Sequence, residues 1–188
     1  MFIQTEHTPN PQTLKFLPGK VVMEEGTAFF KNIEETSSSP LAKKLFSVDG
    51  VLGVFLGSDF ITITKPENVE WNIMKPLVLG KIMDHFSSGE ENYILQEIKE
   101  AKGSFITNQD DSEIVKQIKE LLDTRVRPAV AMDGGDIIYN DYKDGIVYLH
   151  MQGACSGCPS STATLKMGIE NMLKHYIPEI NEVRPIDA

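Results

Sequence analysis

The sequence lacks features that would place it among common classes of binding protein. It has no cluster of lysine or arginine, and its 18 basic and 27 acidic side chains give a net charge of -9. Proteins that bind nucleic acids neutralise phosphates with clustered cations. No apolar run approaches the ~18 residues of a membrane span. We therefore expect a protein that binds neither nucleic acid nor membrane.

Cysteine is also scarce. Cys155 and Cys158 are the only two cysteines in the 188 residues. A secreted chain of this size more often carries several spaced cysteines, so one close pair indicates a reducing compartment. Residues 1–6 carry neither the pattern of a secretory signal nor that of an Arg- and Ser-rich presequence, and they are predicted to form a first strand.

Length and charge predict two domains joined by a linker. The hydrophobic fraction of 41% is sufficient for one or two ordinary cores in 188 residues. Residues 89–111 hold 6 acidic and 2 basic side chains, and they begin and end with polar, turn-forming residues. We expect an acidic linker there, between a first domain at 1–88 and a second at 112–188.

The first domain is predicted to mix strands and helices. A short helix is expected at 41–46, because Ser39 and Pro40 suit a helix start. Apolar residues at helical spacing predict a longer helix through Trp71, Met74, Val78, Ile82 and Phe86. Pro76 should kink or delimit that helix. The predicted strands are 2–6, 13–16, 21–24, 51–56 and 60–64, the last two forming a hairpin.

The second domain is predicted in the order α-β-β-α-β, with the cysteine loop before its second helix. The first helix is expected to begin at Asp111 or Ser112 and to end around Arg127-Pro128. The second is expected to begin at Pro159 or Ser160 and to stop before Pro178. The predicted strands are 137–142, 146–151 and 182–184, the first two joined as a hairpin by 143–145. The fold class is α+β, with two small mixed α/β domains.

The Cys155-Ser156-Gly157-Cys158 motif is the strongest candidate for chemistry. Thiolates are soft ligands for zinc, copper(I) and iron-sulfur centres, which need four ligands where this chain supplies two. A second subunit could supply the others. The motif lies at a predicted helix N-terminus, which should favour the thiolate form of both cysteines.

Spacing alone leaves three interpretations open. The pair is compatible with an iron-sulfur cluster, with a thiol-disulfide oxidoreductase, or with structural zinc shared between two subunits. Oxidoreductases place the motif after the first strand of a parallel unit, whereas here it follows a predicted hairpin. Copper carriers favour methionine two residues before the first cysteine, and that position is Gly153.

Other residues that could bind metal have simpler interpretations. Asp133 and Asp136 flank two glycines, a pattern typical of a turn. The histidines are scattered and predict surface or core-edge positions: His7, His85, His150 and His175. The methionines near the motif are expected to pack in the core: Met132, Met151, Met167 and Met172.

Several motifs together resemble one known family. In the second half they are residues 121–130 (LLDTRVRPAV), 133–136 (DGGD) and 153–161 (GACSGCPSS). In the first half they are residues 8–16 (TPNPQTLKF), 45–51 (LFSVDGV) and 57–62 (GSDFIT). The chain resembles Nfu proteins, which have an Nfu N-terminal domain followed by a NifU-like C-terminal domain. This resemblance covers nearly the whole chain apart from the linker.

The resemblance implies a carrier, not an enzyme. It implies a 4Fe-4S cluster, with 2Fe-2S as an alternative, bound by the cysteines matching Cys155 and Cys158 and bridging a homodimer. Apo iron-sulfur proteins would receive the cluster, and upstream assembly machinery would supply it. The first domain, which has no cysteine, would dock partners. We expect a bacterial cytoplasm, with the mitochondrial matrix after presequence removal as the alternative.

Overall fold

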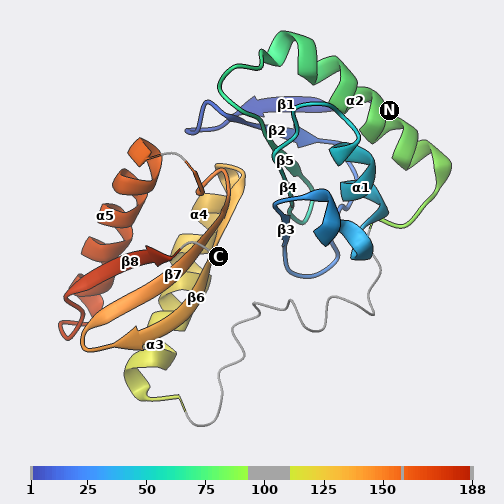
Figure 1. The fold of residues 1–188 in the computed structure, drawn as a ribbon. Coiled ribbons are helices and arrows are strands. Elements are labelled where there is room, and N and C mark those ends of the chain that lie inside the picture. Colours follow the sequence, from blue (N-terminus) through green and yellow to red (C-terminus); the bar gives the residue numbers. More distant parts are fainter. Residues whose placement is uncertain (1, 93–110, 158, 187–188) are drawn as a thin grey trace. The chain divides into compact units, whose positions relative to one another are not determined.

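The computed structural model describes residues 2–92, 111–157 and 159–186, with only the backbone of 159–161. The chain forms two compact units, whose described parts are 2–92 and 111–186. Both units mix helices with an antiparallel or mixed sheet (Figure 1). The predicted fold class, with two small α/β domains, is confirmed. The central part of the predicted linker lies outside the described residues.

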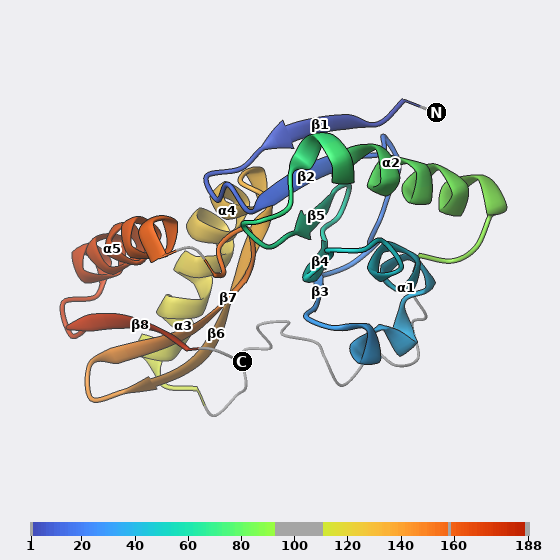
Figure 2. The same ribbon diagram turned by 45° about the horizontal axis from the view of Figure 1, so that its top comes forward.

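The first unit is an antiparallel sheet covered by helices on one face (Figures 1 and 2). Its strands are β1 (Gln4–His7), β2 (Thr13–Leu17), β3 (Ala28–Phe30), β4 (Gly53–Leu56) and β5 (Ile61–Thr64), in the order β1-β2-β5-β4-β3. The helices are the 3-10 helix η1 (Ile33–Ser38), α1 (Pro40–Phe46) and α2 (Trp71–Ser88). Alternate strand residues such as Phe16 and Ile61 pack with Leu41 and Val78 to form the core.

The predicted strand at 21–24 is wrong. The backbone N–H groups of Val22 and Met23 both donate to the carbonyl of Ser58, at 2.8 and 3.2 Å. Two neighbouring N–H groups that donate to the same carbonyl cannot continue a β-ladder, because the N–H groups of successive residues in a strand point to opposite sides of the strand. Both side chains are instead buried from an irregular segment, and the edge strand β3 forms a few residues later.

The two α-helices described in the first unit, α1 and α2, form where expected. Ser39 Oγ accepts a hydrogen bond from the N–H of Ala42 at 3.1 Å, so Ser39 caps α1 and Pro40 occupies its first turn. Pro76 was expected to kink or to delimit the second helix, and the second alternative is wrong, because α2 runs through Pro76 to Ser88. Pro76 lies on the exposed side of α2, where water can hydrate the carbonyl that the missing N–H leaves free.

The second unit has the predicted α-β-β-α-β order. Its helices are α3 (Glu113–Leu121), a π-helical turn η3 (Leu122–Val126), α4 (Arg127–Met132) and α5 (Pro159–Tyr176). Its strands are β6 (Gly135–Lys143), β7 (Ile146–Gly153) and β8 (Glu182–Ile186). Strand β7 is central, antiparallel to β6 and parallel to β8. Asp144 and Gly145, both with positive φ, form the β6–β7 turn.

The predicted end of the first helix near Arg127-Pro128 is wrong. The π-helical turn connects α3 to α4 without a break, so the helical segment continues to Met132. Pro128 lies in the first turn of α4. The N–H groups of a first turn have no partner within their own helix, so the missing N–H of proline removes no hydrogen bond from α4. Asp133 and Gly134 then form the turn predicted for 133–136, and β6 already begins at Gly135.

The core of the second unit fixes the position of the cysteine loop. Val147, Leu149 and Met151 on β7 pack against apolar residues of the helices. The loop begins directly after this central strand and leads into α5. Within the described residues, no helix is long and apolar enough to cross a membrane.

Candidate functional site

Cys155 lies in the loop that joins β7 to α5, two residues after the end of the strand. Its side chain is part of the core and the residue is only 5% exposed. The Cys155 N–H donates to the carbonyl of Gln152 at 3.3 Å. The Thr162 hydroxyl of α5 donates to the carbonyl of Cys155 at 3.2 Å. The backbone of the first cysteine is therefore held from both the strand and the helix.

Gly134, just before β6, and Gly135, the first residue of β6, hold the loop from the other side. The Ala154 N–H donates to the carbonyl of Gly134 at 3.1 Å. A β-carbon at Gly135 would lie 2.5 Å from Cys155 Sγ and 2.7 Å from the carbonyl oxygen of Gln152. Only glycine allows this approach of β6 to the cysteine. We call Gly134 and Gly135 the glycine cradle.

An ion pair anchors the residue that follows the cradle. Arg127 donates from Nε and Nη2 to the two carboxylate oxygens of Asp136, both at 2.8 Å. The Asp136 side chain is 4% exposed, and it also accepts the N–H of Ile137. These bonds raise the pKa of Arg127. They tie the start of α4 to strand β6, which begins with Gly135 of the cradle.

The expectation that the helix N-terminus favours a thiolate at Cys155 is wrong for the buried thiol. Burial of the thiol raises the pKa of Cys155 to about 12, with a further contribution from the negative charges of Asp133 and Asp136. Moving a thiolate out of water costs more free energy than its interaction with the helix N-terminus contributes. The thiol is therefore protonated at neutral pH while it lies in the core.

Cys158, the second predicted ligand, lies outside the described residues. The structure therefore does not test how the two sulfurs are arranged, and the pair stays a prediction. Within the described ranges, no three His, Cys, Asp or Glu side chains gather so that they could hold a metal ion.

The other candidates occupy varied positions. His7 and His175 are exposed, whereas His85 is buried beside Asn92 and His150 contacts Asn140. Asp136 is not a turn residue, because it belongs to β6 and binds Arg127. Met151 and Met172 pack in the core as predicted. The same prediction is wrong for Met132 and Met167, which are 76% and 64% exposed.

Sequence reasoning missed the residues that position Cys155. The glycine cradle was interpreted only as a turn, and the Arg127–Asp136 pair was not foreseen. Two adjacent glycines followed by an acidic residue at the start of a strand were the available signal, since a strand seldom begins with glycine without a close approach.

Comparison with known proteins decides the family. The family model described as "Scaffold protein Nfu/NifU N terminal" matches residues 3–89, and that described as "NifU-like domain" matches residues 118–184. NifU-like protein 5, mitochondrial, of Arabidopsis thaliana is 56% identical over 185 residues, covering 97% of this chain and 67% of its own length. The chain belongs to the Nfu/NifU family of scaffold proteins.

Two further relatives of this Nfu/NifU chain are similarly close. NifU-like protein 4, mitochondrial, of Arabidopsis thaliana is 56% identical over 97% of this chain. The NFU1 iron-sulfur cluster scaffold homolog, mitochondrial, of Drosophila sechellia is 53% identical over 99% of it. The chain spans 65% of the length of each of these two relatives. The name of the Drosophila relative describes a scaffold and not an enzyme, in line with the expectation of a non-enzyme.

Among solved structures, the NMR structure of a NifU-like protein from Saccharomyces cerevisiae aligns with 52% of this chain and 87% of its own, at 31% identity and a TM-score of 0.46.

Proposed function

We propose that this Nfu/NifU protein is an iron-sulfur cluster scaffold and carrier that holds a 4Fe-4S cluster between two copies and passes it to apo-proteins. The observation that carries the proposal is the position of Cys155, in a loop that the glycine cradle and Thr162 hold at the start of α5. Membership of the scaffold family supports it. The name of the Drosophila relative supports an iron-sulfur cluster as the cargo.

The number of ligands supports a shared cluster. Both 4Fe-4S and 2Fe-2S clusters are usually held by four cysteine thiolates, and this chain has only Cys155 and Cys158. Two copies supply the full set. The resemblance to Nfu proteins supports the 4Fe-4S type, and iron and sulfide analysis distinguishes it from 2Fe-2S, the alternative.

Transfer would proceed by exchange of ligands. A thiolate of the recipient forms a bond to iron as the bond from one scaffold cysteine breaks, and the released sulfur takes up a proton. Cys155 then returns to its buried place beside Gly135. Repetition at the other cysteines moves the cluster without any change in its oxidation state. A recipient with four ligands of its own and a more enclosed site would retain it.

The burial of Cys155 argues against the thiol-disulfide alternative. Reactive redox thiols lie in partly exposed surroundings that stabilise the thiolate, whereas Cys155 is 5% exposed and has a raised pKa. A zinc ion bridging two copies would use the same ligands, and metal analysis distinguishes it from a cluster.

The two domains would divide the work. We propose that residues 112–188 bind the cluster and that residues 1–88, which contain no cysteine, dock partners through the linker at 89–111. Apo iron-sulfur proteins would be the recipients and cluster-assembly proteins the donors. The relatives are named as mitochondrial, which supports the mitochondrial matrix as the compartment. Our first expectation, a bacterial cytoplasm, gains no support from these names.

A transfer assay tests the proposal. The loaded full-length chain and loaded residues 112–188 are each mixed with an apo-ferredoxin, and transfer is followed by the recipient's spectrum with and without an iron chelator. We expect direct transfer that the chelator does not intercept, and slower transfer from the truncated chain. Transfer that the chelator abolishes would mean that free iron is released, and the carrier proposal would be wrong.

A further inference from the structure

A short segment after α2 folds back onto the first unit. Gly89 ends the helix with a φ of 74°, a left-handed conformation that glycine adopts without strain. The chain then turns so that Asn92 lies beside His85 in the last turn of α2. We call residues 89–92 the strap. They are the first four residues of the expected linker, yet the first unit holds them.

Asn92 connects the strap to three parts of the first unit. Its side-chain Nδ2 donates to the carbonyls of Val21 and Val22, at 3.2 and 3.1 Å. Its backbone carbonyl accepts the hydroxyl of Ser39, the residue that caps α1, at 2.6 Å. Its Oδ1 lies 3.0 Å from Nε2 of His85. The strap therefore ties the end of α2 to the start of α1 and to the irregular segment around Val22.

These contacts determine which ring nitrogen of His85 carries the proton. Both N–H groups of the Asn92 amide are used by backbone carbonyls, so Oδ1 faces the imidazole as an acceptor and Nε2 must be the donor. Nδ1 is then the basic nitrogen of the ring. Nδ1 is buried and has no hydrogen-bond partner among the described residues. The next proton to bind His85 must therefore bind at Nδ1, inside the closed strap.

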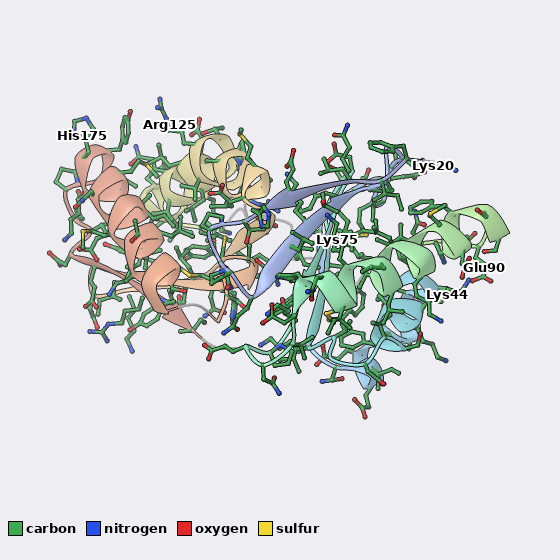
Figure 3. The ribbon with its side chains drawn as sticks, turned by 90° about the horizontal axis from the view of Figure 1, so that it is seen from above. Lys20, Lys44, Lys75, Glu90, Arg125 and His175 are labelled. Atoms are coloured by element: carbon green, nitrogen blue, oxygen red, sulfur yellow. The ribbon has the colours of Figure 1, made fainter. Side chains whose placement is uncertain are left out.

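Three charged side chains face this end of α2, and they do not offset a cation at His85. Glu90 Oε2 of the strap lies 3.8 Å from His85 Nδ1, but it already pairs with Lys44 of α1 at 2.9 Å (Figure 3). Lys20 Nζ lies 5.6 Å from the ring of Phe86, which packs edge-on against the His85 ring. Two lysines and one carboxylate surround a ring that is 0% exposed. A proton on Nδ1 would therefore place an uncompensated positive charge in a buried site.

We propose that the strap is an acid-sensitive device of the first unit, closed while His85 is neutral and opened when a proton from solvent binds Nδ1. Opening admits water to the imidazolium and breaks the bonds of Asn92. It releases Val22 and Met23, each 1% exposed, and it lengthens the tether to the second unit by up to about 14 Å, the extended length of four residues. The proposal goes beyond the carrier function and does not depend on the cluster.

The expected size of the effect follows from proton linkage. Burial lowers the pKa of His85 in the closed strap, against the opposing effect of its hydrogen bond to Asn92. In the open strap the ring should titrate near its ordinary pKa of about 6.5. The closed strap is then fully stable above ~6.5 and loses stability below it, and the open population should rise about tenfold between pH 7.5 and 5.5.

Amide hydrogen exchange of the full-length, 15N-labelled chain tests the proposal. The N–H groups of Val22 and Met23 both donate to the carbonyl of Ser58, so their protection reports on the segment that the strap holds. After correction for intrinsic exchange, we expect their protection to fall about tenfold from pH 7.5 to 5.5 and to depend little on low concentrations of urea, as in local opening. Amides of β5 should be better protected and depend on urea, as in global unfolding. Equal protection and equal urea dependence in both sets would overturn the proposal.

Two variants with a matched control separate the strap from other sources of pH dependence. His85→Gln keeps an amide beside Asn92 but does not titrate, so protection of Val22 should be the same at both pH values. Asn92→Ala should lower that protection at both, whereas Asn68→Ala, at an exposed position, should change nothing. Protection of β5 in each variant shows that the unit stays folded. A tenfold fall that persists in His85→Gln, or equal protection in Asn92→Ala and Asn68→Ala, would show that the strap does not act as proposed.

Discussion

The backbone of Gly135 lies so close to the side chain of Cys155 that a β-carbon at Gly135 would be 2.5 Å from Sγ. Real β-carbons do not approach a sulfur to that distance, so strand β6 and the cysteine loop can meet only through glycine. The position of the proposed cluster ligand therefore depends on a residue twenty positions earlier in the chain.

Replacing Gly135 with alanine should displace the Cys155 side chain and reduce cluster loading at least about tenfold, a loss equivalent to ~1.4 kcal/mol in binding. Iron and sulfide bound per chain after reconstitution measure the effect. Gly168→Ala is the matched control, because its β-carbon would meet nothing within 4 Å. Equal loading in the two variants would show that the close approach of Gly135 is not needed.

Replacing Arg127 with glutamine should destabilise the second unit by about 2–3 kcal/mol, because it leaves the buried carboxylate of Asp136 without its cation. This is less than the ~3–5 kcal/mol typical of breaking a fully buried ion pair, because the Arg127 side chain is 24% exposed. The loss of stability is measured by hydrogen exchange of the β6 amides. Asp123→Asn removes only the more exposed pair to Arg127 and should cost less than ~1 kcal/mol; equal losses in both variants would contradict the anchoring role of Asp136.

Serine at Cys155 or at Cys158 should abolish cluster loading and leave the unit folded. The change at Cys155 places a hydroxyl in a buried site and should cost about 1–3 kcal/mol of stability. Circular dichroism and iron analysis of both variants provide the test. Unfolding of the metal-free variants, or restoration of structure by zinc in the wild type, would instead support a structural metal.

The local patterns of the second domain were sufficient to predict its elements. The apolar spacing on α5, the Asp144-Gly145 turn and the alternation along β7 all correspond to what the structure contains. These features depend on neighbours in sequence. The α3–α4 boundary was missed because a π-helical turn places Pro128 at a new helix start, and such a turn has no signature in the periodicity alone.

The contacts around the site could not be predicted in the same way. The burial of Cys155 depends on its packing against β6, which is a tertiary relationship. The segment around Val22 has strand-forming residues, yet a single carbonyl of Ser58 takes both of its donors. The motif identified the cysteines, but their surroundings followed only from the fold.

The first unit should lose stability as the pH falls below about 6.5. His85 is fully buried at the end of α2, with Nε2 3.0 Å from Asn92 Oδ1. Its pKa is lowered, chiefly by burial and also by the charge of Lys44, against the opposing effects of Asn92 and Glu90. Figure 3 shows Lys44 and Glu90 together, and they form an ion pair at 2.9 Å. A histidine with a depressed pKa binds protons more readily when unfolded, so stability is full above ~6.5 and declines below it.

Urea unfolding followed by the fluorescence of Trp71, the only tryptophan, measures this change between pH 7.5 and 5.5. We expect the decline to be smaller in His85→Gln, which keeps an amide beside Asn92 but does not titrate. His7→Gln, at an exposed position, is the control. A decline of the same size in all three proteins would assign the pH dependence to other groups.

The central claim is that two chains share one iron-sulfur cluster through Cys155 and Cys158. Anaerobic reconstitution of the full-length chain, followed by size-exclusion chromatography with light scattering and iron and sulfide analysis of each peak, tests it most directly. We predict that iron and sulfide elute with a dimer at four of each per two chains, and that removing the cluster returns the protein to a monomer. A cluster that elutes stably with a monomer, or a dimer that holds zinc and no sulfide, would contradict the account.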